Sequence, residues 1–239
     1  MTSRLTALTF LARDPAKLVA FWSAALDWRL HSEEHGATLV PTDGTRFPIV
    51  FELSSEDKRS QNRNHLDLTT NSVKDQSATV QRLVDLGAMH ADVGQGPHEA
   101  HVVLADPEGN ELCIIEPDNA FLADCERLGA INCDGTKETG YFWSDVLGWP
   151  LIWDQNDETV IRDPDGTGPK ITWSGPPLLP KSGHNRLQLT ITPSEGLATH
   201  EEVERLIDLG ATHTALGTSE GVLIMLDPDG NEFRVIVRP

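Results

Sequence analysis

The sequence DPAKLVAFWSAALDW, residues 14–28, returns later in the chain as DGTKETGYFWSDVLGW, residues 134–149. Trp22 of the first copy aligns with Trp143 of the second, a separation of 121 residues. Aromatic and aliphatic residues recur every three to four positions in both copies, which is typical of a helix that buries one face. A repeat period of about half the chain indicates that a whole domain has been duplicated.

Two further blocks repeat at nearly the same separation. VQRLVDLGAMH, which begins at Val80, matches VERLIDLGATH, which begins at Val203. DPEGNEL, which begins at Asp106, matches DPDGNEF, which begins at Asp227. In both copies of the last block, an Asp, a Pro and a Gly stand at the positions that favour a type I turn. We therefore expect a tight hairpin turn there, and a helix ending in a left-handed glycine at Gly87 and at Gly210.

The three repeated blocks predict two homologous domains, residues 1–119 and 120–239, which meet in the polar stretch EPDNAFLADCE. Each half also divides into two similar units, in which a strand is followed by a helix and then by short strands. In the first half the expected elements are strand 5–12, helix 15–26, strand 65–70 and helix 73–86. The pattern predicts an α+β protein made of four strand-helix-strand-strand-strand modules.

Composition excludes several classes of protein. The chain has 239 residues, with 19 Lys plus Arg against 37 Asp plus Glu, a net charge of −18. Such a charge repels phosphate backbones and anionic lipids, so we expect no nucleic-acid or membrane partner. No apolar run approaches the roughly 20 residues that span a bilayer. Three cysteines without a C-x-x-C spacing are typical of a reducing compartment, and we expect a cytoplasmic protein.

Taken together, RDPAKLVAFWSAALDW, NHLDLTT, VQRLVDLGA and DPEGNELCIIE resemble the vicinal oxygen chelate superfamily. That group contains the glyoxalases, the bleomycin- and fosfomycin-resistance proteins and the extradiol dioxygenases. The resemblance covers almost the whole chain, twice. It implies the glyoxalase/bleomycin resistance/dioxygenase fold, in which each half pairs its two βαβββ modules and curls their sheet into a concave trough, with the helices outside. It also implies a small-molecule partner, and a monomer or a homodimer.

Strand alternation predicts which side chains line these troughs. In NHLDLTT the two leucines should pack against a helix, so His65 and Asp67 face the trough. We expect this pair to be catalytic, because a carboxylate orients an imidazole that acts as a general base. Alternation also brings Glu111 and Cys113 to the trough, where we expect them to bind a ligand together with His101 on an adjacent strand. Cys113 would be a nucleophile only if His65 lowered its pKa.

Metal-dependent relatives hold a divalent ion on the first and last strands of each module. The corresponding residues here are Ala7, Glu52, His65 and Cys113 in the first half, and Leu128, Trp173, Arg186 and Arg234 in the second. Two arginines repel a cation, so the resemblance implies no metal in the second domain. In the first domain two interpretations remain open: a polar cavity without any cofactor, which we favour, and a divalent metal held by Glu52 and His65.

The second half suggests a different chemistry. By the same alternation, Arg186, Gln188, Glu232 and Arg234 share its concave face. Two guanidinium groups can clamp a carboxylate or a phosphate, which would make Arg186, Gln188 and Arg234 ligand-binding residues. They can equally form a structural ion cluster with Glu232 and other acids. The strongly negative charge of the chain favours the ion cluster.

These observations favour a small-molecule-binding protein with a degenerate metal site. We expect it to hold an apolar or weakly anionic metabolite or antibiotic in a concave trough. The candidate aromatic walls of that trough are Trp28, Trp149, Trp153 and Trp173. Two alternatives stay open. One is an isomerase, lyase or dioxygenase of the superfamily that uses His65 with Glu52, and the other is an interaction module that binds no small molecule.

Overall fold

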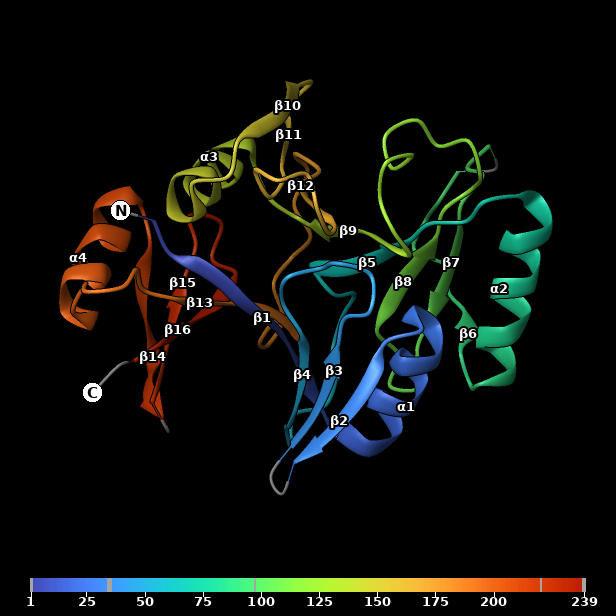
Figure 1. Ribbon diagram of the computed structural model, residues 1–239, viewed down its shortest axis with the longest axis horizontal. Coiled ribbons are helices and arrows are strands. Elements are labelled where there is room, and N and C mark those ends of the chain that lie inside the picture. The colour runs from blue at the N-terminus through green and yellow to red at the C-terminus, as the bar shows by residue number, and fades with distance from the viewer. Residues whose placement is uncertain (1, 34–35, 97, 220, 238–239) are drawn as a thin grey trace.

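The computed structural model describes residues 2–33, 36–96, 98–219 and 221–237, which form four modules of one helix and four strands each (Figure 1). Module 1 contains β1 (Arg4–Ala12), α1 (Pro15–Leu26), β2 (Arg29–Glu33), β3 (Gly36–Val40) and β4 (Ile49–Leu53). Module 2 contains β5 (Asn64–Leu68), α2 (Val73–Asp85), β6 (Met89–His90), β7 (Val102–Ala105) and β8 (Glu111–Ile114). Module 3 contains β9 (Leu128–Cys133), α3 (Lys137–Leu147), β10 (Leu151–Gln155), β11 (Glu158–Ile161) and β12 (Lys170–Trp173). Module 4 contains β13 (Leu187–Thr192), α4 (Thr199–Leu209), β14 (Thr212–Ser219), β15 (Val222–Leu226) and β16 (Glu232–Ile236).

The modules pair across the two halves of the chain. The first sheet has the strand order β14-β15-β16-β13-β1-β4-β3-β2, and the second has the order β10-β11-β12-β9-β5-β8-β7-β6. The first sheet therefore joins modules 1 and 4 through the antiparallel pair β1 and β13. The second joins modules 2 and 3 through the antiparallel pair β5 and β9. Figure 1 shows β1 running from module 4 to the rest of module 1.

The predicted α+β class and the four paired βαβββ modules are confirmed. The expectation that each half curls its own sheet is wrong. The alternation of side chains specifies which face of a strand is buried, but it does not specify which strand lies beside it. Module 1 is followed by a connection, residues 54–63, that carries the chain from the first sheet to the second.

The two helices predicted in the first half are confirmed, with α2 ending one residue earlier than predicted. α1 matches the expected helix 15–26, and its first turn is capped by the carboxylate of Asp14, which accepts the backbone N–H of Lys17. The hydroxyl of Ser72 caps α2 in the same way. Gly87 and Gly210 have φ angles of 102° and 118°, which confirms the predicted left-handed residues. Within the described residues, no helix has the length and apolar character needed to cross a bilayer.

One hydrophobic core contains residues from all four modules. Trp22 of α1 is fully buried in it, and its indole N–H donates to Oδ2 of Asp106 at 3.1 Å. Trp143 of α3 donates to Oδ2 of Asp227 at 3.4 Å. The two aspartates start the repeated turns, and the first turn is closed by the N–H of Gly109, which donates to the carbonyl of Asp106 at 2.8 Å. Each half is thus tied together by one Trp–Asp bond, although its modules belong to different sheets.

We predict that Trp22→Phe lowers the free energy of unfolding by about 2 kcal/mol, because it removes core volume and one of the two donors to Oδ2 of Asp106, leaving only Asn110. Urea unfolding measures the change. Trp153→Phe is the matched control, since Trp153 is 39% exposed, and its effect should stay below about 0.5 kcal/mol. Equal effects of the two substitutions would contradict a structural role for the Trp22–Asp106 bond.

Candidate functional site

The concave face of the second sheet carries two rows of side chains, each crossing several strands. One row runs through Cys113 on β8, Asp67 on β5, Ala130 on β9 and Lys170 on β12, which are register partners. The other runs through His65, Asn132 and Thr172 on β5, β9 and β12. The residues between them on β5, Leu66 and Leu68, are buried in the main core. The alternation of β5 therefore places His65 and Asp67 on the concave face.

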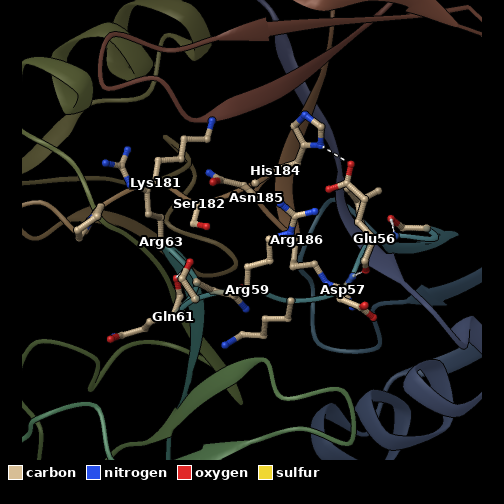
Figure 2. Close-up of a pocket in the computed structure, with 17 residues that line it drawn as sticks. Glu56, Asp57, Arg59, Gln61, Arg63, Lys181, Ser182, His184, Asn185 and Arg186 are labelled. Carbon is tan, nitrogen blue, oxygen red and sulfur yellow. Dashed lines mark hydrogen bonds and ion pairs between the residues drawn. The ribbon is translucent and has the colours of Figure 1, made fainter.

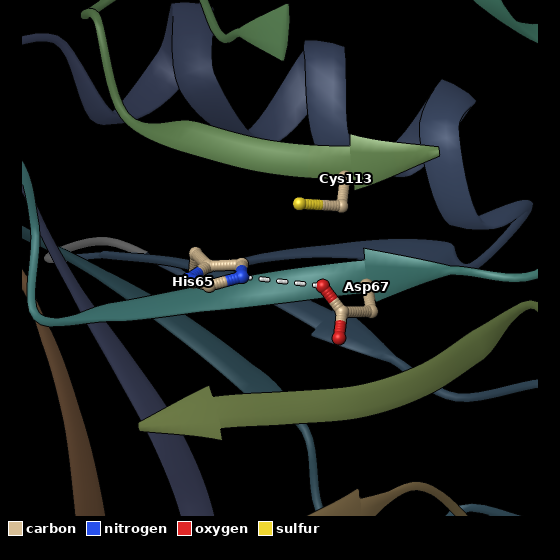
Figure 3. Close-up of side chains that lie close together, drawn as sticks. All are labelled: His65, Asp67 and Cys113. Atoms are coloured by element: carbon tan, nitrogen blue, oxygen red, sulfur yellow. Dashed lines mark ion pairs between the residues drawn. The ribbon is translucent and has the colours of Figure 1, made fainter. Parts of the chain in front are cut away.

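His65, Asp67 and Cys113 form a compact cluster on this face (Figure 3). Nε2 of His65 lies 3.3 Å from Oδ1 of Asp67, and the thiol of Cys113 projects from the adjacent strand. One nitrogen, oxygen or sulfur atom from each residue lies within 4.8 Å of the other two. Asp67 and Cys113 are buried, and the His65 side chain is 24% exposed.

The charges in this cluster differ from those of a typical catalytic base and nucleophile. Burial alone would lower the pKa of His65, but contacts with Asp67 and Cys113 outweigh burial and raise that pKa to about 10. His65 is therefore an imidazolium at neutral pH and cannot accept a proton there. Burial raises the pKa of the Cys113 thiol, which stays protonated at neutral pH. This state argues against His65 as a general base and against Cys113 as a nucleophile.

A cavity of about 690 Å³ opens beside the cluster and reaches Asp67. Its floor includes Asn132 and Thr172 from the second row of side chains. Its mouth is formed by three large apolar side chains, Phe121, Ile152 and Trp153, which are 39%, 45% and 39% exposed. Asp67 thus belongs both to the His65 cluster and to the cavity wall.

The segment that links the two halves covers part of this trough. Leu122 packs with Cys113, Ile115 and Ala130 in a small apolar cluster on the concave side. The ammonium group of Lys170 donates to the backbone carbonyl of Phe121 and, at 2.9 Å, to Oδ1 of Asp124. These contacts hold the linker in place. They also give the ammonium group of Lys170 a carboxylate counter-ion and a carbonyl acceptor within the chain.

The expected metal pair is not assembled. Glu52 lies on β4 of the first sheet, whereas His65 lies on β5 of the second, because the modules of one half join different sheets. Nη2 of Arg234 bonds both carboxylate oxygens of Glu52, at 2.7 and 2.8 Å. The potential metal ligands that do converge are His65, Asp67 and Cys113. Their N, O and S atoms fit a borderline-soft divalent ion such as Zn²⁺. Binding of such an ion would require the loss of the His65 and Cys113 protons.

The concave face of the first sheet is called the first trough. Its polar side chains form ion pairs and hydrogen bonds with other residues of the chain. Arg186 donates to Oε2 of Glu108 at 2.6 Å, and both side chains are at least 90% buried. The carboxylate of Glu232 accepts the ammonium of Lys181 at 2.6 Å. The amide of Gln188 donates to the carbonyl of Asn185 at 3.0 Å. Together with the Arg234–Glu52 pair, these contacts match the ion-cluster interpretation of the second half.

A small pocket of about 30 Å³ lies at one end of this cluster, between residues 54–63 and 180–186 (Figure 2). Figure 2 shows the Arg186 guanidinium near its centre, with His184 paired to Glu56 beside it. The volume holds little more than water molecules. The end of the first trough near Arg186 is therefore filled by its own side chains.

Two other predicted binding residues lie outside the cavity wall. Nδ1 of His101 lies 3.6 Å from Oε2 of Glu99, just before β7. Glu111 faces the concave side, but Lys58 binds its carboxylate at 2.6 Å. Both residues are thus placed away from the cavity described above.

Only two of the four candidate tryptophans, Trp153 and Trp173, line the cavity. Trp28 donates its indole N–H to Asp43, and Trp149 packs against the main core.

Sequence reasoning missed Asn132 and Thr172. It assigned the concave face of β9 and β12 to Leu128 and Trp173, which are 0% and 1% exposed and belong to the main core. The alternation of each strand could have placed them. Ile131 and Ile171 are buried in the main core, so the next residues, Asn132 and Thr172, point to the opposite, concave face. The error came from aligning the family's ligand positions before the alternation of each strand was applied.

Comparison with known proteins identifies the family. The family model described as glyoxalase-like domain matches the chain twice, over residues 7–115 and 129–236. The chain belongs to the glyoxalase-like domain family. Among solved structures, glyoxalase I from Zea mays is 15% identical with a TM-score of 0.65, and the match covers 99% of this chain and 92% of that one. A putative dioxygenase from Bacillus subtilis is 13% identical with a TM-score of 0.59, covering 100% and 87%.

At sequence identities this low, the similar solved structures establish only the fold of this chain and not its activity. The resemblance to the vicinal oxygen chelate superfamily is confirmed by the family match and by the shared fold. None of the curated proteins matches the sequence. The activity of this glyoxalase-like protein therefore has to be argued from its own residues.

We predict that Asp67→Asn lowers the pKa of His65 from about 10, because burial is then opposed by the contact with Cys113 alone. NMR titration of the His65 ring in metal-free protein measures this change. Glu99→Gln, which removes the carboxylate beside His101, is the control and should leave His65 unchanged. A His65 ring that titrates near 6.5 in the unsubstituted protein would contradict the charged cluster.

We predict that Arg186→Gln lowers the free energy of unfolding by about 3 kcal/mol, since it leaves Glu108 buried without its cation. Arg13→Gln breaks an exposed pair with Asp57 and should cost less than about 1 kcal/mol. Chemical denaturation compares the two variants. If Arg186→Gln kept full stability but abolished binding of inorganic phosphate, the anion clamp would be the correct interpretation instead.

Proposed function

We propose that this glyoxalase-like protein binds a small molecule in the trough of the second sheet. The observation that carries the proposal is the cavity of about 690 Å³, with polar residues on its floor and exposed aromatic and aliphatic side chains at its mouth. Ligand pockets typically have volumes of about 300–1,000 Å³ and apolar walls with a few polar groups. The ligand class that suits this lining is an apolar or weakly anionic metabolite or antibiotic.

The charge state of the cluster supports binding over catalysis. His65 is already protonated and paired with Asp67, so the pair can orient a polar group of a ligand without a proton transfer. The first trough is filled by buried ion pairs, which supports one binding site in each chain. We further propose that the protein is a cytoplasmic monomer, because its cysteines are free and its modules pair within one chain.

A metal-dependent enzyme of the superfamily is the second candidate. It is favoured by one observation, the convergence of His65, Asp67 and Cys113 next to the cavity. A bound divalent ion would supply a Lewis acid that polarises a substrate oxygen. In that case Asp67 and Cys113 would hold the ion, His65 would have to be neutral, and Asn132 would orient the substrate from the adjacent strand.

Titration with Nile red, an uncharged apolar fluorophore, tests the proposed cavity. We predict saturable binding with one site per chain, and at least tenfold weaker binding in the double variant Ile152→Ser, Trp153→Ser, which removes the apolar mouth. Ile207→Ser, at an exposed position on α4, is the control and should bind as the unsubstituted protein does. Absence of saturable binding, or equal binding by both variants, would contradict the proposal.

Zinc titration of the EDTA-treated protein separates the two candidates. If the binding function is correct, Zn²⁺ binds weakly at pH 7 and Nile red binding is unchanged by EDTA. Stoichiometric Zn²⁺ binding that is lost in Cys113→Ser would favour the metal-dependent enzyme.

A further inference from the structure

We infer that the ligand of this trough is a flat, uncharged heteroaromatic molecule with a lactam or imide edge, that is, a ring N–H beside a ring carbonyl. The inference rests on the proposed function, because it names the class of molecule that the same cavity takes. It is carried by three polar side chains on the cavity floor whose hydrogen-bonding capacity is not used within the described part of the chain.

These three side chains form a strip across the sheet. Asn132 and Thr172 are register partners on β9 and β12, and Asp67 lies one row away on β5. Oγ1 of Thr172 is buried, and no hydrogen-bond partner is found for it among the described residues. Oδ1 of Asp67 is also buried, and its contact with His65 at 3.3 Å lacks hydrogen-bond geometry. Buried polar atoms without partners are uncommon in folded proteins, so the strip is suited to an external partner.

The order of donors and acceptors along the strip selects the ligand edge. A carboxylate only accepts hydrogen bonds, so the group opposite Asp67 must be a donor such as a ring N–H. The amide of Asn132 can donate to a carbonyl next to that N–H. The hydroxyl of Thr172 can serve a second carbonyl or ring nitrogen farther along the same edge. A lactam or an imide presents this sequence of groups in one plane.

The walls explain why the molecule should be flat and aromatic. Trp153 and Phe121 stand exposed at the mouth of the cavity with Ile152. Aromatic side chains prefer stacked or edge-to-face contacts with other rings, and these contacts add to the effect of burying apolar area. A planar ring system can therefore place one edge on the polar strip while its faces contact the walls.

Charge argues for a neutral molecule. The cavity belongs to a chain of net charge −18, which disfavours phosphorylated ligands. Lys170 is the cation on the cavity wall, and it is already bonded to Asp124 and to the carbonyl of Phe121. A cationic ligand would find the carboxylate of Asp67 already facing Nε2 of His65 at 3.3 Å. Glu158, an acid elsewhere on the cavity wall, is exposed to solvent, where pairing with a cation would add little to binding.

Lumichrome tests the inference, because it is an uncharged tricyclic ring system with an imide edge. We predict that lumichrome quenches the tryptophan fluorescence of the protein saturably, with a micromolar Kd. 1,3-Dimethyllumichrome keeps the ring but lacks both N–H donors, and it should bind at least twentyfold more weakly. Both ligands are tested on the unsubstituted protein, so this comparison does not depend on the folding of a variant.

Two substitutions locate the contact. Thr172→Val, which keeps the shape and removes the hydroxyl, and Asn132→Leu should each weaken lumichrome binding about tenfold. Thr38→Val, on β3 of the first sheet, is the matched control and should have no effect. Thermal unfolding of each variant shows whether its fold is retained.

The outcomes separate this inference from the proposed function. If Nile red binds in the cavity but lumichrome does not, or if the dimethyl analogue binds equally well, the lactam edge is refuted and the binding function stands. Failure of both Nile red and lumichrome to bind would refute the binding function and the inference together. Equal effects of Thr172→Val and Thr38→Val would place lumichrome outside the trough.

Discussion

The antiparallel pairing of β1 with β13 and of β5 with β9 determines the rest of the structure. It builds each sheet from one module of each half, so residues far apart in the sequence share a concave face. It brings Asn132 beside His65 in the second trough. In the first trough, Arg234 of β16 meets Glu52 of β4. The same pairing leaves the two helices of each half in contact with each other, and a Trp–Asp hydrogen bond ties a helix of one module to a turn of the other.

The two troughs have diverged through the chemistry of a few positions. Arg186 occupies the position in module 4 that His65 occupies in module 2, and it reaches the buried carboxylate of Glu108. A long guanidinium side chain with an internal partner fills its trough. The shorter His65 lies 3.3 Å from Asp67 on its own strand and leaves the space above β9 and β12 open. The difference in length and in partner explains why one face is filled and the other holds a cavity.

Much of the fold follows from the sequence. The helical spacing around Trp22, the cap at Asp14 and the left-handed glycines at Gly87 and Gly210 are local features, and each is set by a few neighbouring residues. The strand that pairs with the first strand of each module is not set by local sequence. The backbone edges of β5 and β13, for example, offer β1 similar hydrogen-bonding groups. That is why the alternation placed His65 and Asp67 on a concave face but could not show that Glu52 belongs to the other sheet. Asn132 and Thr172 were within reach of the same alternation, and they were missed because the family's ligand positions were applied first.

The strand pairing itself is therefore the most direct point at which to test the account. Isotope-edited NOE spectroscopy on the full-length protein can detect backbone contacts between neighbouring strands. The account predicts contacts between β1 and β13, and between β5 and β9, including one between the backbones of His65 and Asn132. Contacts between β1 and β5, and between β9 and β13, would show that each half closes its own sheet and would contradict the account.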